Sequence, residues 1–172
     1  FCLMVMIYYI SGGERSGKTR YAMNLAMELS DRPVYLATSR VWDEDFEKRV
    51  VRHQGERDER WENWEEEKLL GQLDISGKVV VMDCVTLWLT NWFMDLEQDV
   101  EACLRHGKEE ITKLFAQDGT VIIISNEIGM GVHADTHMGR KFVELQGWMN
   151  QFIAGKADKA FFMVSGLPLQ LK

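Results

Sequence analysis

The sequence predicts an α/β fold in which a mainly parallel central sheet is flanked by helices and ends in a short antiparallel hairpin at one edge. Several stretches are apolar at nearly every position and rich in Val and Ile, which is typical of strands buried on both faces of a parallel sheet. Helical patterns separate these stretches, and the chain has 172 residues. We therefore expect residues 1–172 to form one domain around one site.

The expected core strands are four apolar runs. The first lacks a basic leader and a cleavage signature, and it is shorter than the roughly 20 apolar residues of a spanning helix, so we expect a strand and no transmembrane segment. Because the chain begins with Phe, no function is assigned to the residues before Met4 or Met6. The runs are FCLMVMIYYI (1–10), PVYLAT (33–38), VVVMDC (79–84) and TVIIIS (120–125).

Helical patterns lie between the runs, at 20–29, 43–53, 87–115 and 140–154. This alternation favours parallel strands with helices on both faces of the sheet. The tail KAFFMVSGLPLQLK predicts two short strands joined at Ser165–Gly166, with Pro168 confining the last strand to an edge. The charged segment RDERWENWEEEK contains two tryptophans and is interpreted as an ordered surface segment.

Composition restricts the class of protein. A hydrophobic share of 46% with 27% charged residues indicates a soluble globular chain rather than a disordered one. The net charge of −7, with scattered basic residues, argues against a nucleic-acid partner. Three cysteines without a CxxC pair favour a reducing cytoplasm over a disulfide or zinc framework, and each is expected to act as a small apolar residue.

The stretch GGERSGKT matches the phosphate-loop pattern GxxxxGK[ST] in full. Glycines let such a loop point its backbone N–H groups inward, and the following helix adds its positive end. Because the stretch lies between an apolar run and a helical pattern, we favour a P-loop over a chance glycine-rich turn. The expected nucleotide-binding residues are Gly12, Gly13, Glu14, Arg15, Ser16, Gly17, Lys18 and Thr19, with Lys18 also catalytic through the β and γ phosphates.

Two residues are candidate ligands of Mg²⁺. The Thr19 hydroxyl follows the P-loop lysine, where this pattern places a metal ligand. Asp83 ends an apolar run, as expected of the acidic residue that orients the metal in a P-loop protein. The alternative is that Asp83 only caps the following segment TLWLTN.

A histidine follows the second helical pattern. Phe46, Val50 and His53 are spaced on one helical face, so His53 is expected to face the protein if the two apolar residues do. The spacing alone favours a structural or solvent-exposed histidine over a chemical role.

The chain resembles, along nearly its whole length, the bifunctional adenosylcobinamide kinase / adenosylcobinamide-phosphate guanylyltransferase family of cobalamin biosynthesis. A P-loop is common to many enzymes, whereas this series of blocks in this order is specific. The matching blocks are GGERSGKT, YLATS, RVVRHQGER with WENWE behind it, MDCVTLWLTN, SNEIGMG and RKFVELQGWMNQFIAGKADKAFFMVSGLPLQLK.

The resemblance implies a P-loop fold of the recombinase-core type, two reactions and a homotrimer with sites between subunits. The γ phosphate of ATP or GTP passes to the aminopropanol hydroxyl of adenosylcobinamide. A histidine then attacks the α phosphate of GTP, and GMP passes to the new phosphate to give adenosylcobinamide-GDP. His53 matches the guanylylated histidine, and neutral imidazole is a competent nucleophile near pH 7. Further nucleotide contacts implied are Ala37, Thr38, Ser39, Gln54, Gly55, Glu56, Arg57, Glu65 and Asp83.

Some positions leave alternatives open. The family usually has Thr where this chain has Asn63, and some relatives have a second histidine where it has Arg52. Glu127 either positions the acceptor hydroxyl or the metal's water shell, or caps the glycine-rich turn that follows. His133 and His137 flank Asp135 in an expected loop, where solvent exposure is favoured over a corrinoid contact. Trp88, Trp92 and Trp148 are expected in the core or in subunit contacts.

Two other functions are compatible with part of the pattern. A kinase without guanylyl transfer needs the P-loop alone, and a nucleotide-binding switch needs no turnover. The blocks RVVRH and NEIGMG favour the bifunctional enzyme, because a switch needs neither. The sequence does not distinguish ATP from GTP in the kinase step, nor does it indicate whether one P-loop serves both reactions.

Overall fold

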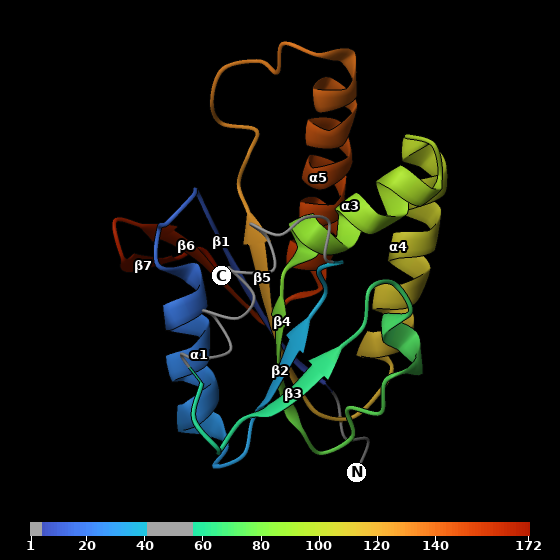
Figure 1. The fold of residues 1–172 in the computed structure, drawn as a ribbon. Helices are drawn as coiled ribbons and strands as arrows, with labels where there is room; N and C mark the ends of the chain where they lie inside the picture. The colour runs from blue at the N-terminus through green and yellow to red at the C-terminus, as the bar shows by residue number, and fades with distance from the viewer. Residues whose placement is uncertain (1–4, 41–56) are drawn as a thin grey trace.

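Seven strands form one sheet in the computed structural model, which describes residues 5–40 and 57–172 (Figure 1). The sheet order is β3-β2-β4-β5-β1-β6-β7, and every neighbouring pair is parallel except the antiparallel pair β6–β7. This order confirms the predicted mainly parallel sheet with an edge hairpin. The strands are β1 Met6–Gly12, β2 Val34–Ala37, β3 Glu62–Glu65, β4 Val79–Asp83, β5 Thr120–Asn126, β6 Lys159–Val164 and β7 Leu167–Gln170.

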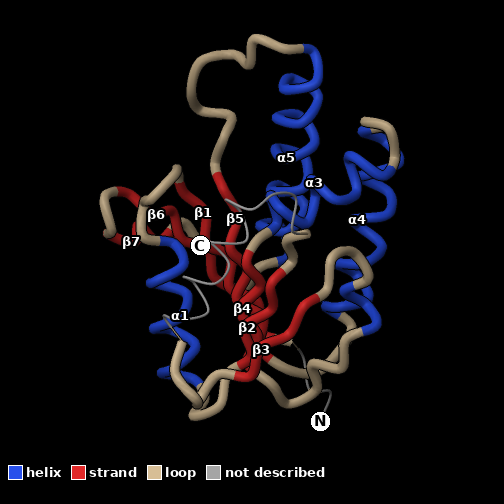
Figure 2. The backbone as a smooth tube through the Cα atoms, viewed as in Figure 1, coloured by secondary structure: helices blue, strands red, loops and turns tan. Residues whose placement is uncertain are grey.

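Helices cover both faces of the sheet and make a three-layer fold (Figure 2). On one face lies α1 (Lys18–Leu29), whose Ala22 and Ala26 are buried against Ile10 of β1 and its neighbours. The other face is covered by α3 (Val85–Asp95), α4 (Val100–Phe115) and α5 (His137–Lys156), with the short helix η1 (Leu70–Gln72) against α4. The central strands are therefore buried on both sides, which explains their continuous apolar runs.

The predicted helix over 87–115 is wrong in its extent, because the chain breaks it into α3 and α4. Glu97 and Gln98 have φ values of 50° and 65°, which no α-helix accommodates. Asp99 then caps α4, since its side chain accepts a hydrogen bond from Ala102 N at 2.9 Å. The polar turn after Leu96 thus separates two helices that the apolar pattern joined.

Three other boundaries differ from the expectations. The charged segment after Arg60 contains a strand, β3, whose Glu62–Glu65 pairs with Val34–Ala37 of β2. The helix expected over 140–154 begins at His137, because Thr136 caps it through Gly139 N at 3.0 Å. Likewise α1 begins at Lys18 rather than at Arg20. The predicted helix at 43–53 lies outside the described residues.

The described cysteines act as small apolar residues, as expected. Cys84 and Cys103 are free and buried, and burial raises the pKa of their thiols to about 12 and about 11, respectively. Within 5–40 and 57–172, no helix is long and apolar enough to cross a membrane.

Candidate active site

The carboxyl ends of five parallel strands meet at one edge of the sheet. Gly12 of β1 lies beside Asn126 of β5, and Asp83 of β4 lies beside Ala37 of β2. Ala37 in turn lies beside Glu65 of β3. Open parallel sheets bind ligands at this edge, so the strand ends that the sequence singled out are brought together where a ligand is expected.

The P-loop joins β1 to α1 and needs glycine at two positions. A Cβ atom at Gly12 would lie 2.6 Å from Ser16 Oγ and 2.8 Å from Met163 O. Gly17, the N-cap of α1, has φ 95°, and a Cβ there would lie 3.1 Å from the Cα of Gly166 in the β6–β7 turn. The loop therefore closes against the C-terminal hairpin, where Gly166 N also donates to Ser16 O at 3.0 Å.

The loop is arranged to receive an anion. Among the described residues, the backbone N–H groups from Gly13 to Thr19 find no hydrogen-bond acceptor, and α1 adds its N-terminal end. Lys18 is only 7% exposed and lies across the loop, with Nζ donating to Gly13 O at 2.5 Å. Burial lowers the pKa of Lys18. Its ammonium group is thus held inside the loop, where a phosphate chain would replace the carbonyl as its partner.

Glu14 and Arg15 extend from the loop into solvent. Both side chains are exposed, and their closest charged atoms are 4.0 Å apart. Arg15 has φ 52°, a left-handed conformation within the loop. At these two predicted positions the loop therefore offers its backbone, whereas Ser16 and Lys18 offer buried side chains.

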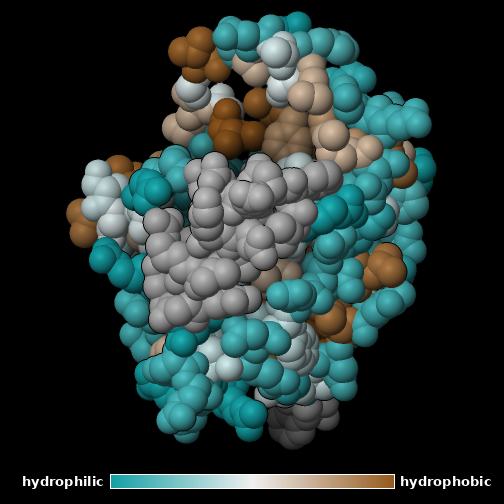
Figure 3. Space-filling model, viewed as in Figure 1, coloured by the Kyte–Doolittle hydropathy of each residue, from teal (hydrophilic) through white to brown (hydrophobic). Residues whose placement is uncertain are grey.

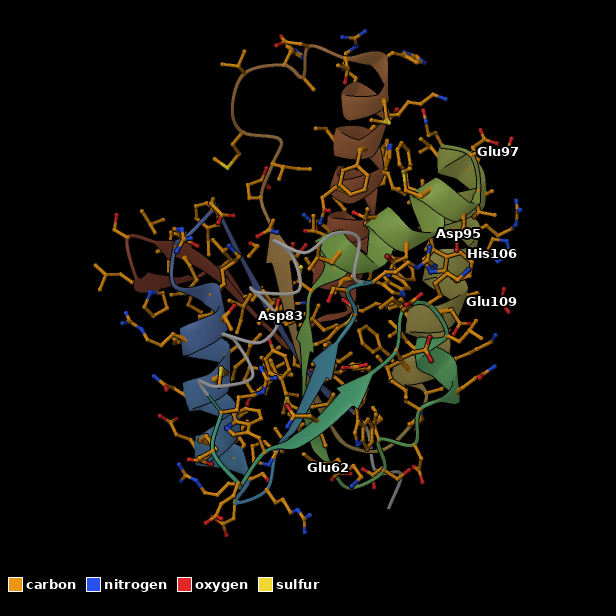
Figure 4. All side chains as sticks on the ribbon, in the orientation of Figure 1. Glu62, Asp83, Asp95, Glu97, His106 and Glu109 are labelled. Atoms are coloured by element: carbon orange, nitrogen blue, oxygen red, sulfur yellow. The ribbon has the colours of Figure 1, made fainter. Side chains whose placement is uncertain are left out.

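Three side chains on the sheet face covered by α1 form what we call the α1-face cluster: Thr19, Tyr35 and Asp83. Asp83 Oδ2 accepts hydrogen bonds from Tyr35 OH at 2.5 Å and from Thr19 Oγ1 at 3.3 Å. Figure 4 shows Asp83 at the end of β4 on the side where α1 lies. Burial and the adjacent Asp83 charge both raise the pKa of Tyr35 far above its ordinary value, so the phenol remains a donor.

The α1-face cluster fits a magnesium ion that is bound mainly through nucleotide phosphates. Mg²⁺ prefers oxygen ligands and usually keeps waters and one or two carboxylates. Thr19 and Asp83 supply a hydroxyl and a carboxylate within hydrogen-bonding distance of each other. No group of three or more His, Cys, Asp or Glu side chains suited to a metal occurs in the described part of the chain.

Arg57 connects this cluster to β3. Its guanidinium carbon lies 3.8 Å from the centre of the Tyr35 ring, and Nε donates to Asn63 Oδ1 at 2.7 Å. Asn63 therefore holds Arg57 over the tyrosine. Glu65 ends β3 with an exposed side chain. His53, Gln54, Gly55 and Glu56 lie outside the described residues.

The YLATS block lies at the end of β2. Thr38 is fully buried, and its hydroxyl donates to Cys84 O at 2.8 Å and accepts from Cys84 N at 3.0 Å. Asn91 Nδ2 donates to Thr38 O at 2.8 Å. The Thr38 side chain therefore joins the ends of β2 and β4 through hydrogen bonds. Ala37 and Ser39 beside it are partly exposed at the edge of the sheet.

At the end of β5, Glu127 caps the glycine-rich turn. Its Oε1 accepts from Gly129 N at 2.5 Å and from Met130 N at 3.1 Å. Glu127 N donates to Gly12 O at 2.9 Å, so the turn is also joined to the P-loop strand. The structural alternative for Glu127 is thus observed, and a contact with the acceptor remains a prediction.

A second polar cluster lies under the site on the opposite sheet face, and sequence reasoning missed it. We call it the α5-face cluster: Tyr9, Ser125, Gln146 and Asn150. Ser125 Oγ donates to Asn150 Oδ1 at 2.6 Å and accepts from Gln146 Nε2 at 2.8 Å. Burial raises the pKa of Tyr9 to about 12, although the interacting Ser125 and Ser11 hydroxyls oppose this rise. The available signal was polar side chains at helical spacing within a buried face of α5.

The remaining candidates lie away from the P-loop. His133 and His137 are exposed, and His137 begins α5. Trp88 and Trp92 are core residues, whereas Trp148 is 51% exposed. In Figure 3, hydrophobic residues gather at the top of the molecule, over the loop that joins β5 to α5; the exposed apolar residues of this loop include Met130 and Val132. Figure 4 shows Asp95 and His106 at the α3–α4 side of the molecule, away from Asp83.

A glycine-rich loop between the first strand and helix, with an acidic residue ending another parallel strand of the same sheet, defines an α/β protein of the P-loop class. Residues 8–171 match the family described as cobinamide kinase / cobinamide phosphate guanyltransferase. The chain belongs to this family, as the sequence resemblance predicted.

Curated relatives agree with this assignment. The chain is 34% identical over 168 residues to the bifunctional adenosylcobalamin biosynthesis protein CobP of Pseudomonas aeruginosa, covering 95% of each chain. It is 32% identical over 182 residues to the bifunctional adenosylcobalamin biosynthesis protein CobU of Escherichia coli, covering 97% of this chain and 100% of the relative. Identity to the Salmonella typhimurium protein of the same name is 31% over 184 residues.

Proposed function

We propose that the protein is a bifunctional enzyme that phosphorylates adenosylcobinamide with ATP or GTP and then transfers GMP to the product. The observation that carries this proposal is a P-loop with a buried lysine and an adjacent Thr–Asp pair, in a chain whose family match spans residues 8–171. A kinase without guanylyl transfer remains the alternative that the experiment below tests.

In the first reaction, the hydroxyl oxygen of the aminopropanol arm attacks the γ phosphorus of the nucleotide. The bond from γ phosphorus to the bridging oxygen breaks, and the nucleoside diphosphate leaves. The free N–H groups of the P-loop and the ammonium of Lys18 would bind the β and γ phosphate oxygens and stabilise the charge that develops there. Thr19 and Asp83 would hold Mg²⁺, which supplies further neutralisation of that charge.

In the second reaction, an imidazole nitrogen of His53 attacks the α phosphorus of GTP, and pyrophosphate leaves. A phosphate oxygen of adenosylcobinamide phosphate then attacks the same phosphorus, which breaks the bond to His53 and gives adenosylcobinamide-GDP. Splitting one transfer into two displacements is the usual advantage of a covalent intermediate. Arg57, four residues after His53, has a guanidinium suited to phosphate oxygens.

We further propose that the enzyme works in the cytoplasm, where ATP and GTP are available, as one domain that assembles into a homotrimer. The trimer rests on the family resemblance. Sedimentation equilibrium tests it directly, since a monomer of 19.9 kDa and a trimer differ threefold in mass. A monomeric, fully active enzyme would contradict the trimer and leave the reactions unaffected.

The deciding experiment is labelling of the pure protein with Mg²⁺ and GTP radiolabelled at the α phosphate. We expect protein-bound label that is lost in acid and stable in alkali, as for a phosphoramidate. His53→Ala should carry no label. His133→Ala is the matched control, because this histidine is exposed in the loop after β5, and it should label like the wild type.

Each outcome separates the candidates. Label on wild type and His133→Ala alone supports guanylyl transfer through His53. Undiminished label on His53→Ala would contradict this role. Phosphorylation of adenosylcobinamide without any label would leave only the kinase, and nucleotide binding without turnover of either kind would indicate a switch.

A further inference from the structure

We propose that Tyr35 is a positioning residue for the metal–nucleotide site, and that it acts by fixing the carboxylate of Asp83 through its phenolic hydroxyl. Tyr35 begins the YLATS block, but neither the P-loop pattern nor the nucleotide contacts implied by the family resemblance include this tyrosine. The inference rests on the nucleotide-binding half of the proposed function. It concerns how the chain orients Asp83, the carboxylate that accepts a hydrogen bond from the P-loop threonine.

The register of the sheet brings Tyr35 to Asp83. Tyr35 pairs with Val81, two residues before Asp83, and both side chains lie on the face covered by α1. The phenol extends along the strand direction, and its hydroxyl donates to Asp83 Oδ2 at 2.5 Å. Thr19 Oγ1 donates to the same oxygen at 3.3 Å. Both donors therefore use Oδ2.

The other carboxylate oxygen is left for a ligand. Within the described part of the chain, Asp83 Oδ1 accepts no hydrogen bond. Because Tyr35 of β2 donates a hydrogen bond to Oδ2, the Asp83 carboxylate cannot rotate freely about χ2. Its second oxygen, Oδ1, therefore keeps one direction. Partners of this kind, which orient a metal ligand without touching the metal, change metal affinity strongly when they are removed.

The ring of Tyr35 is itself held on two sides. Trp61 packs against it edge to face, with centroids 6.2 Å apart, and the Arg57 guanidinium lies 3.8 Å from its centre. Asn63 Oδ1 fixes Arg57 by accepting from its Nε at 2.7 Å. Tyr35 thus links Arg57, which ends the sequence block that contains His53, to the carboxylate beside the P-loop threonine.

Binding of Mn²⁺ in the presence of a non-hydrolysable GTP analogue, followed by electron paramagnetic resonance, tests the proposal without any corrinoid. Tyr35→Phe keeps the ring contacts and removes only the hydroxyl. We expect the dissociation constant of Mn²⁺ to rise about tenfold, which corresponds to about 1.4 kcal/mol, while the metal-free affinity for the analogue changes less than about twofold. Kinase activity should need more Mg²⁺ and recover at saturation.

Tyr8→Phe is the matched control, because Tyr8 is equally buried on the same sheet face and its hydroxyl has no hydrogen-bond partner among the described residues. It should leave the Mn²⁺ constant unchanged. In an Asp83→Asn background, Tyr35→Phe should have no further effect on metal binding, since the two residues act as a unit. Asn63→Ala, an exposed change that frees Arg57, should weaken metal binding in the same direction and to a smaller extent.

The outcomes are separable from those of the proposed function. If the wild type does not bind the nucleotide analogue, the proposed function fails. If it binds, and Tyr35→Phe leaves the Mn²⁺ constant unchanged, the positioning role is wrong although the enzyme assignment survives. Lower thermal stability of Tyr35→Phe with unchanged metal affinity would make Tyr35 a purely structural residue and overturn the proposal. Should Tyr35→Phe not fold, an unchanged Mn²⁺ constant in Asn63→Ala would overturn it.

Discussion

The two polar clusters beneath the P-loop lie on opposite faces of the same sheet and differ in where they leave an acceptor without a hydrogen bond. In the α5-face cluster, Ser125 both donates to Asn150 and accepts from Gln146. In the α1-face cluster, two donors meet on one oxygen of Asp83, and the second oxygen accepts nothing from the described residues. In the first arrangement the side chains hydrogen-bond to one another and the buried Gln146 Oε1 has no partner among the described residues, whereas the second leaves a carboxylate acceptor at the sheet edge.

This difference predicts a structural role for the α5-face cluster and a chemical role for the α1-face cluster. Buried polar groups that hydrogen-bond to one another stabilise one packing arrangement. Removal of one partner leaves the others without that hydrogen bond. An acceptor kept available beside free N–H groups serves a ligand instead. We therefore expect changes on the α1 side to alter activity more than stability, and changes in the α5-face cluster to do the reverse.

The largest expected effect follows from Lys18→Ala. Removal of the ammonium that the P-loop holds should lower kcat/KM of the kinase reaction by about 10²–10³-fold, as for other groups that stabilise transition-state charge. Lys108→Ala, which removes an exposed lysine of α4, is the control and should retain activity. Steady-state kinetics and thermal unfolding measure both. A large loss of stability with little loss of kcat/KM would contradict the expectation that changes on the α1 side alter activity more than stability.

A smaller effect, on stability, is expected for Ser125→Ala. The change leaves Asn150 Oδ1 without its 2.6 Å donor and Gln146 Nε2 without its closest acceptor, so the free energy of unfolding should fall by about 1–3 kcal/mol. Urea denaturation measures it, with the exposed Ser76→Ala as the control, for which we expect less than about 0.5 kcal/mol. Unchanged stability with a large loss of kcat would place Ser125 in the chemistry.

The smallest expected effect is the dependence of stability on alkaline pH. Because burial raises the pKa of Tyr9 to about 12, the folded protein keeps this phenol protonated while the unfolded chain ionises near its ordinary value of about 10. The contribution of the protonated Tyr9 phenol to the free energy of unfolding is complete below pH ~10. It is lost as the pH rises to ~12, by at most about 1.4 kcal/mol per pH unit. In urea titrations across this range, Tyr9→Phe should show a shallower decline than the wild type; identical slopes would contradict this assignment.

Much of the sheet could be predicted because its central strands are apolar at every position. The edge strand β3 could not, since ENWE carries two charges and obtains its pairing from β2 alone. Similarly, the break between α3 and α4 depends on positive φ values at Glu97 and Gln98. Neither Glu nor Gln is a residue type that indicates a positive φ.

The P-loop residues were predictable because their spacing is fixed by the phosphate chain that they bind. Tyr35 was not, because its role depends on register. The strands containing Tyr35 and Asp83 were both identified, but only the pairing of Tyr35 with Val81 directs the hydroxyl to the carboxylate. The α5-face cluster depends likewise on how α5 is rotated against β5, which the helical pattern alone leaves open.

The contact between the P-loop and the β6–β7 turn has a consequence for synthesis of the chain. Gly166 follows Ser16 by 150 positions in the sequence (166 − 16), yet the loop closes against it, and its N–H donates to Ser16 O at 3.0 Å. Because a ribosome releases a chain from its amino end, the loop emerges before the β6–β7 turn that it contacts. A nascent chain that stops before the β6–β7 hairpin contains the P-loop sequence but lacks the turn at Gly166 against which the loop packs.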